Sequence, residues 1–248
     1  MQLYFIRHGQ SINNANWNNP GYQENPDPCL TELGRKQARR LARYLKGHQS
    51  ITDENNWNIQ NRDGFGLTHL YTSLMERAVG TAAHLAHALP GIPFEAWPEI
   101  HEEGGIFSHE DKTKPMGLPG KPRSFFEKNF PALILPEALD ESGWWNRPFE
   151  YDEERGPRAA RFLTELLARH GDQDGRAEQR IAIVSHGGFF VQLMCALLDL
   201  PHRQASHHLK SWFLLNNCSI SRFDLGRGDM LVAYLNRTDH LPDHLVTA

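Results

Sequence analysis

The sequence predicts an α/β fold, a three-layer sandwich in which helices flank a mostly parallel central sheet. Two short, continuous apolar runs, at residues 3–6 and 181–184, contain the β-branched and aromatic residues typical of strands buried on both faces. Segments between these runs have apolar residues at the i, i+3/4, i+7 spacing of amphipathic helices. Strands that alternate with helices favour a parallel sheet, because each helix carries the chain back to the start of the next strand.

The individual elements follow in chain order from the same patterns. Between the two strands, an apolar stripe at helical spacing recurs in three segments: 38–45, 78–89 and 159–167. The second strand leads into residues 189–198, which are apolar nearly all round and therefore predict a buried helix. Three further strands, separated by short polar turns, are expected to close one edge of the sheet: 212–215, 220–223 and 230–235.

Length and composition predict one ordinary domain. The chain has 248 residues, of which 40% are hydrophobic, so one core of useful size can form and residues 1–248 are expected to be a single domain. A net charge of −4 lacks the basic excess needed to bind a nucleic acid backbone. The three cysteines, Cys29, Cys195 and Cys218, suit neither a disulfide framework nor a zinc site. They favour a reducing compartment.

The first residues of the chain do not resemble a targeting segment. Their apolar run ends at an Arg-His pair after four residues, far short of a signal peptide or a membrane span. We therefore predict a cytoplasmic protein without a membrane or nucleic acid partner. Its oligomeric state cannot be predicted from these patterns.

Two histidines stand in matching positions at the ends of predicted central strands. Arg7-His8-Gly9 follows the first strand, and Ser185-His186-Gly187-Gly188 follows the second. Open α/β sheets bind ligands at the carboxyl ends of their strands. Glycine lets the backbone approach a ligand closely, and a following helix N-terminus supplies N–H donors for an anion. A single histidine at a strand end is more often a hydrogen-bonded core residue, but two in matched settings predict a phosphate pocket.

Four motifs in order resemble the histidine phosphatase superfamily, which also contains the cofactor-dependent phosphoglycerate mutases. The opening motif is Arg7-His8-Gly9-Gln10-Ser11 with Asn14, although glutamine stands where many relatives have glutamate. It is followed by Leu30-Thr31-x-x-Gly34-x-x-Gln37-Ala38, by Ser73-x-x-x-Arg77-Ala78-x-x-Thr81-Ala82, and by the Ser185-to-Gly188 motif. The resemblance covers nearly the whole chain outside an insertion at about residues 108–151.

The resemblance implies a role for each matched residue. His8 would be the nucleophile that forms a phosphohistidine, which splits one difficult displacement into two easier ones. Arg7 and Arg77 would bind phosphate oxygens through their planar guanidinium groups, and a protonated His186 would donate a further charge-assisted hydrogen bond. Substrate binding is also implied for a group of smaller motif residues: Ser11, Asn14, Thr31 and Gly187. No metal and no cofactor are implied.

The leaving group of such a reaction needs a proton from a carboxylic acid. The family pattern before a glycine-containing turn aligns with Ile100-His101-Glu102, so Glu102 is the preferred general acid. Glu103 is the alternative.

The insertion at 108–151 is rich in proline and has no sustained period, so we expect it to cover the active site. Its Trp144-Trp145 pair would either stack on a substrate ring or, as is commoner, cover apolar core. Its basic residues would either bind a second anionic group or, as is commoner, form a solvated face: Lys112, Lys114, Lys121 and Arg123.

The preferred function is a metal-independent phosphomonoester hydrolase that acts on a small phosphorylated substrate. One alternative is a phosphoglycerate-type mutase, which would use the same His8 but protect the phosphoenzyme from water. The other is a non-catalytic module that binds a phosphorylated ligand. The identity of the substrate stays open, because the segments that would recognise it are the least like the family.

Overall fold

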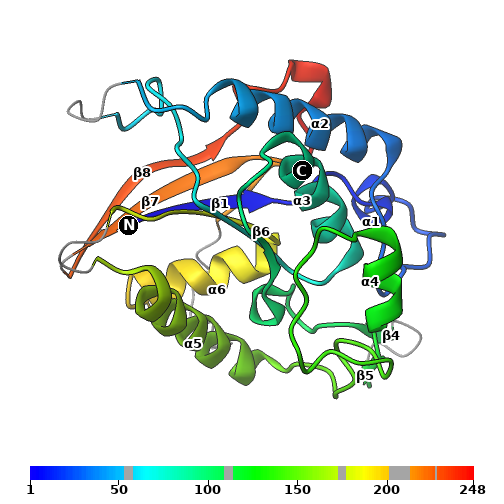
Figure 1. Cartoon of the computed structure of the whole chain (residues 1–248). Helices are drawn as coiled ribbons and strands as arrows, with labels where there is room; N and C mark the ends of the chain where they lie inside the picture. The colour runs from blue at the N-terminus through cyan, green and yellow to red at the C-terminus, as the bar shows by residue number, and fades with distance from the viewer. Residues whose placement is uncertain (53–57, 109–113, 173–176, 201–212, 227) are drawn as a thin grey trace.

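A computed structural model of the chain describes residues 1–52, 58–108, 114–172, 177–200, 213–226 and 228–248. In this part of the chain the main sheet has six strands in the order β3-β2-β6-β1-β7-β8 (Figure 1). Four of them run parallel: β1 (Gln2–Arg7), β2 (His69–Thr72), β3 (Phe94–Ala96) and β6 (Arg180–Ser185). Two antiparallel strands, β7 (Ile220–Gly226) and β8 (Asp229–Arg237), follow β1 at one edge. The predicted α/β class with a mostly parallel sheet is therefore confirmed.

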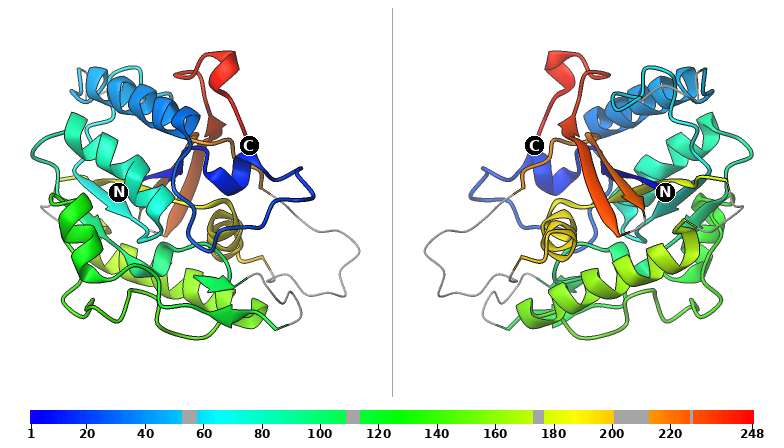
Figure 2. Two further views of the ribbon diagram at one scale, coloured as in Figure 1. Left: turned by 90° about the vertical axis from the view of Figure 1, so that its right-hand side faces the viewer. Right: turned by 90° about the vertical axis from the view of Figure 1, so that its left-hand side faces the viewer.

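Helices cover both faces of this sheet. One face packs against α2 (Glu32–Gly47) and α3 (Glu76–Ala88), and the other against α5 (Asp152–His170) and α6 (Gly187–Leu197). Figures 1 and 2 show these two helical layers with the twisted sheet between them. Successive residues of a strand point to opposite faces. Strand β1 accordingly places Tyr4 and Ile6 in the α2/α3 cluster and Leu3 and Phe5 in the α5/α6 cluster.

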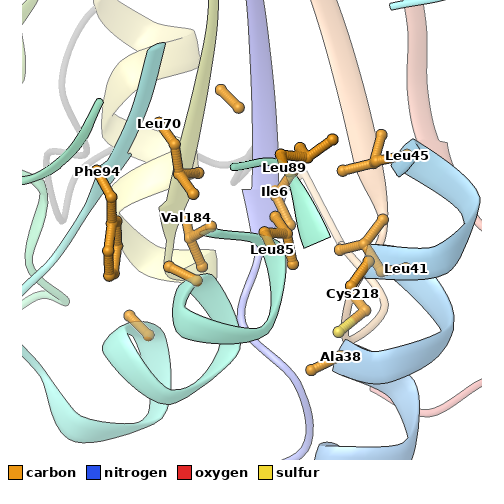
Figure 3. Packing of buried hydrophobic residues seen from close by; sticks show 14 of the residues in the cluster. Ile6, Ala38, Leu41, Leu45, Leu70, Leu85, Leu89, Phe94, Val184 and Cys218 are labelled. Atoms are coloured by element: carbon orange, nitrogen blue, oxygen red, sulfur yellow. The ribbon is translucent and has the colours of Figure 1, made fainter. Parts of the chain in front are cut away.

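The α2/α3 cluster shows why the helical spacings appear in the sequence. Leu85, which is fully buried, lies beside Ile6 and Val184 of the two central strands, and Leu41, also fully buried, lies beside Cys218 (Figure 3). Burying an aliphatic side chain of this size stabilises a fold by about 1.5–3 kcal/mol. The predicted helices at 38–45, 78–89, 159–167 and 189–198 and the strands at 3–6, 181–184, 220–223 and 230–235 all have counterparts in the structure.

One predicted strand is wrong. Residues 213–215 are extended but form no strand, and Trp212 lies outside the described residues. The backbone oxygen of Leu215 accepts a hydrogen bond from the Arg7 Nη1 instead. Two short strands, β2 and β3, were not predicted, because polar residues interrupt their apolar runs, which read His-Leu-Tyr-Thr and Phe-Glu-Ala.

The insertion packs against the sheet edge formed by β3. It contains the short hairpin β4 (Phe107–Ser108) and β5 (Met116–Gly117) and the helix α4 (Arg123–Asn129). Ile134 donates its N–H to Phe94 O at 2.9 Å, and Ala96 N donates to Ile134 O at 2.9 Å. The insertion therefore covers an edge that would otherwise expose unpaired backbone groups. Three short helices complete the fold: α1 (Ile12–Ala15), η1 (Pro98–Ile100) and η2 (Asp243–Leu245).

The distinctive side chains of the insertion serve packing and surface pairing. Trp145 is buried against Gly105, where a Cβ would lie only 2.1 Å from the indole. Lys121 pairs with Glu76 at 3.4 Å, and Arg123 pairs with Glu127 at 3.1 Å. Lys112 lies outside the described residues and Lys114 is exposed. In the described part of the chain, no helix is sufficiently long and apolar to cross a membrane.

Candidate active site

The two histidines of the sequence motifs meet because their strands are neighbours. Strands β1 and β6 pair in parallel with Arg7 opposite Ser185, and the His8 N–H donates to Ser185 O at 3.0 Å. Parallel strands in register end at the same sheet edge. The imidazole rings of His8 and His186 consequently lie with their centroids 5.1 Å apart.

The geometry around His8 defines the state of its ring. Nδ1 lies 2.7 Å from Gly9 O, and the Arg77 Nε donates to His8 Nε2 at 3.2 Å. Nδ1 therefore carries the proton, and the lone pair of Nε2 accepts the hydrogen bond from Arg77. Burial, together with the charges of Arg77 and Arg7, holds the pKa of His8 well below 6.5. The ring is neutral at physiological pH, which is the form that can attack an electrophile.

Two buried polar atoms beside His8 are unsatisfied by the described residues. The Arg7 Nε and the His186 Nδ1 have no hydrogen-bond partner in the described part of the chain. Buried polar groups are usually paired in native proteins, and an anion bound here would supply a partner for both atoms. Both groups can donate a hydrogen bond, His186 once its ring is protonated, so together with Arg77 they suit an anion with several oxygens.

His186 is held by a residue of the third motif. Its Nε2 lies 2.9 Å from the Ser73 Oγ. Burial, then the charge of Arg77 and the neighbouring His8, keep the pKa of His186 well below 6.5, so the ring is neutral on its own. A phosphate dianion beside the unpaired Nδ1 would favour the protonated ring, because opposite charge raises a histidine pKa. Binding of such an anion is expected to take up a proton here.

The two candidate acids have different surroundings. The Glu102 Oε1 accepts hydrogen bonds from the backbone N–H groups of Glu103 at 3.0 Å and Phe189 at 3.1 Å. Burial raises its pKa, Arg77 and Arg7 oppose this, and the charge of Glu103 adds to it. Glu103 instead accepts from Gln192 Nε2 at 2.7 Å and from Arg155 Nη1 at 3.3 Å. Glu103 is thus engaged by two side chains, whereas burial extends the protonated form of Glu102 to higher pH.

Glu102 needs a glycine beside it. A Cβ at Gly188, in the first turn of α6, would lie only 2.4 Å from the Glu102 Oε1. The second glycine of the Ser-His-Gly-Gly motif therefore lets the carboxyl reach the helix N-terminus. Gly187, the first residue of α6, lies beside Arg7, where a Cβ would be 3.8 Å from Nε.

Glu102, Arg77 and Asn14 line one cleft of about 200 Å³. Its other lining comes mostly from two segments, one around and after α1 and one in the loop between η1 and β4 that carries Glu102, here called the acid loop. These residues are Asn13, Trp17, Glu24, Asn25, Pro26, Pro28, Met75, Glu103, Gly105 and Phe107. A larger cavity, about 650 Å³, lies between the end of the insertion and α5, but none of the predicted site residues lines it. We therefore identify the candidate site by the side chains that line the smaller cleft and not by the volume of the cavity.

The remaining predicted binding residues make structural contacts. Ser11 caps α1 and shares a capping box with Asn14, whose Oδ1 accepts from the Ser11 N–H at 3.1 Å. Thr31 caps α2 through Gly34 N at 2.9 Å and donates to the Gln10 Oε1 at 2.8 Å. Neither Ser11 nor Thr31 is among the described residues that line the cleft. Their contacts place the loop after β1 and leave direct substrate binding a prediction.

The glycine of the second motif, Gly34, is needed because two backbone segments pack closely there. A Cβ at Gly34 would lie 2.1 Å from Gln10 O, and a Cβ at Gly9 would lie 2.7 Å from Gly34 O. The loop after β1 and the first turn of α2 therefore pack backbone against backbone. This contact holds the loop that carries His8.

Three residues near the site were missed in the sequence. Asn217 donates to His8 O at 3.0 Å and to Asn14 Oδ1 at 3.3 Å. Asp27 accepts from Glu76 N at the start of α3 at 2.9 Å, and burial raises its pKa to about 6 against the lowering effect of Arg77. Ser73 was noted only as a motif residue. Asn217 and Asp27 stand in irregular segments without periodicity, so only the fold brings them to the site.

The predicted site contains no described metal centre. Within the described ranges, no group of three or more histidine, cysteine, aspartate or glutamate residues is arranged to hold a metal ion. His84 and His87, spaced three apart on α3, are half-buried and exposed respectively.

Comparisons with known proteins find a related sequence and similar folds. A probable phosphoglycerate mutase, GpmB, from Yersinia pestis is 26% identical over 229 residues, which are 90% of this chain and 85% of the relative. A solved phosphoserine phosphatase from Entamoeba histolytica, at 20% identity, superposes with a TM-score of 0.54 over 97% of this chain and 99% of its own. The α-ribazole phosphatase of Shigella flexneri, also at 20% identity, has a TM-score of 0.56 with 96% of both chains covered.

A family model covers nearly all of the described sheet and helices. The model of the histidine phosphatase superfamily (branch 1) matches residues 3–53 and 60–238. This match includes all four sequence motifs. The chain therefore belongs to the histidine phosphatase superfamily.

Proposed function

We propose that this protein is a metal-independent phosphomonoester hydrolase that works through a phosphohistidine on His8. The observation that carries the proposal is a convergence at one sheet edge. A neutral imidazole whose Nε2 meets the Arg77 Nε, buried atoms of Arg7 and His186 without a partner among the described residues, and a carboxyl with a raised pKa lie together there, and Arg77 and Glu102 line the cleft. Each group matches one need of phosphoryl transfer.

In the first step, His8 Nε2 attacks phosphorus while the bond from phosphorus to the alcohol oxygen breaks. That oxygen takes the proton of the Glu102 carboxyl and leaves as the alcohol. Arg7, Arg77 and His186 stabilise the charge on the phosphoryl oxygens throughout. In the second step, a water gives a proton to Glu102 as its oxygen attacks the phosphohistidine. Phosphate leaves, and His8 is neutral again.

The direct test is hydrolysis of p-nitrophenyl phosphate and a panel of phosphorylated metabolites in the presence of EDTA. The wild-type protein is expected to release phosphate at an undiminished rate with EDTA. Rapid quenching should trap an acid-labile phosphoryl group, which mass spectrometry should locate on His8. Loss of all activity in EDTA would reject a metal-independent mechanism. A protein that binds phosphate but never becomes phosphorylated would instead be a binding module.

A mutase is the second candidate, because the curated relatives at 26% identity are named as probable phosphoglycerate mutases. A phosphoglycerate carries a carboxylate besides its phosphate, which needs a second cationic group. Among the described residues that line the cleft, Arg77 is the only lysine or arginine, whereas Glu24, Glu102 and Glu103 are acidic. The nearby cations of the insertion, Lys121 and Arg123, are paired with glutamates. This charge balance supports a leaving group without a carboxylate.

Glycerol 3-phosphate and 3-phosphoglycerate test this directly, since they differ only in a hydroxymethyl group against a carboxylate. We expect kcat/KM for glycerol 3-phosphate to be at least about tenfold higher, because a like charge near the acidic lining costs about 1.4 kcal/mol or more. p-Nitrophenyl phosphate serves as the common reference for both. Preference for 3-phosphoglycerate, or formation of 2-phosphoglycerate from it, would favour the mutase.

A further inference from the structure

We infer that Glu150 and Arg158 are positioning residues, a buried ion pair that holds the loop carrying Glu102 so that its carboxyl meets the leaving-group oxygen. This inference rests on the proposed phosphatase function. It assigns a role to the end of the insertion and to the start of α5, neither of which touches the reacting atoms. The motif residues do not include either member of the pair.

The pair is one of the most buried ionic contacts described. Arg158 is 2% exposed and Glu150 is 7% exposed. The Arg158 Nε donates to Glu150 Oε1 at 2.5 Å, and Nη2 donates to Oε2 at 2.9 Å. This bidentate arrangement fixes the orientation of both groups, since a planar guanidinium fork matches a carboxylate in one geometry only.

Arg158 and Glu150 also form hydrogen bonds to the backbone on both sides of Glu102. Arg158 Nη1 donates to Glu99 O at 2.7 Å and to His101 O at 3.1 Å. Glu150 Oε2 accepts from Gly104 N at 3.3 Å, and Glu150 N donates to Gly104 O at 3.2 Å. The residue between these anchors is the candidate acid. Four hydrogen bonds therefore fix the position of the Glu102 backbone beside the cleft.

The loop has little stiffness of its own. Gly104 and Gly105 both have positive φ, at +82° and +76°. Two consecutive glycines sample many backbone conformations, so this loop needs external contacts to stay in one of them. Arg158 also lies 5.1 Å from the ring centroid of Phe189, whose N–H donates to the Glu102 Oε1. The same guanidinium thus contacts the acid loop and the helix residue that receives the acid.

A buried ion pair can also be purely structural, and losing one partner commonly destabilises a fold. A positioning role predicts something that lost stability does not. An alkyl leaving group depends on protonation by Glu102, whereas p-nitrophenolate leaves readily without a proton. Displacing the acid loop should therefore slow alkyl phosphates selectively.

The test compares kcat/KM, which reports only the steps up to release of the alcohol, for Glu150→Gln and the wild type on p-nitrophenyl phosphate and on the alkyl phosphate that the wild type hydrolyses fastest. Assays are run well below the melting temperature of each protein. We expect the loss on the alkyl phosphate to exceed the loss on p-nitrophenyl phosphate by at least tenfold. Arg158→Lys keeps the buried cation without the fork, and it replaces Glu150→Gln if that variant does not fold.

The matched control is Arg161→Gln on the same helix. Arg161 pairs with the Glu99 side chain at 3.4 Å, but it is 66% exposed and does not hold the loop backbone. It should leave the ratio between the two substrates unchanged. Equal losses on both substrates in Glu150→Gln and Arg158→Lys would overturn the positioning role. If the wild-type protein hydrolyses no phosphate ester, or never carries a phosphoryl group on His8, the proposed function itself is overturned.

Discussion

Replacing His8 with alanine is expected to lower kcat by roughly 10⁴-fold or more on every substrate, because removing a covalent nucleophile removes the whole two-step route. The loss should not depend on the leaving group. The Nε2 of the neutral His8 ring carries the lone pair that would attack phosphorus, and it lies 3.2 Å from the Arg77 Nε. The residual donors on Arg7, Arg77 and His186 could still bind phosphate. We therefore expect phosphate binding to persist while turnover and the trapped phosphoenzyme disappear.

The measurement is single-turnover phosphate release together with titration of inorganic phosphate by calorimetry. His87→Ala is a suitable control, since His87 is exposed on α3 and is not among the described residues that line the cleft. It should retain wild-type rates. If His8→Ala kept activity within tenfold of the wild type, or could still be phosphorylated, another residue would have to be the nucleophile.

Replacing Glu102 with glutamine is expected to lower kcat for alkyl phosphates by about 10²–10⁴-fold, the usual contribution of a positioned general acid. The loss on p-nitrophenyl phosphate should be much smaller in the first step, because p-nitrophenolate leaves without a proton. Glu103→Gln is the matched comparison and should cost about tenfold or less. Its carboxylate is already engaged by Gln192 and Arg155. A larger loss in Glu103→Gln than in Glu102→Gln would exchange their roles.

The pH dependence provides an independent check. Burial raises the pKa of Glu102, so its acid form persists to higher pH than that of an ordinary glutamate. The wild-type kcat for alkyl phosphates should fall as pH rises through this raised value, and Glu102→Gln should lack that limb. The raised pKa of Glu102 also makes the stability of the fold depend on pH. A carboxyl whose pKa is higher in the folded than in the unfolded state lowers the stability of the fold as the pH rises from the unfolded-state pKa to the folded-state pKa. At pH values above the folded-state pKa, Glu102→Gln should therefore have a melting temperature no lower than that of the wild type.

Local sequence already determined the framework of this protein. Continuous apolar runs predicted β1 and β6, helical periodicity predicted α2, α3 and α5, and a segment apolar nearly all round predicted α6, because each of these elements buries apolar side chains. The motifs at the strand ends also identified His8 and His186. Parallel pairing in register then makes their proximity a geometric consequence of the sheet.

Tertiary structure decided everything that depends on contacts between distant segments. Glu102 and Glu103 are adjacent in sequence and chemically alike, but only one receives the N-terminal N–H of α6 while the other meets Arg155 and Gln192. Asn217 reaches the backbone of His8 across 209 residues. Of the strand predicted at 212–215, the described residues 213–215 form no strand, and Leu215 O accepts from Arg7 instead. Periodicity reports which face of a segment is buried, but it carries no information about which distant group that face will meet.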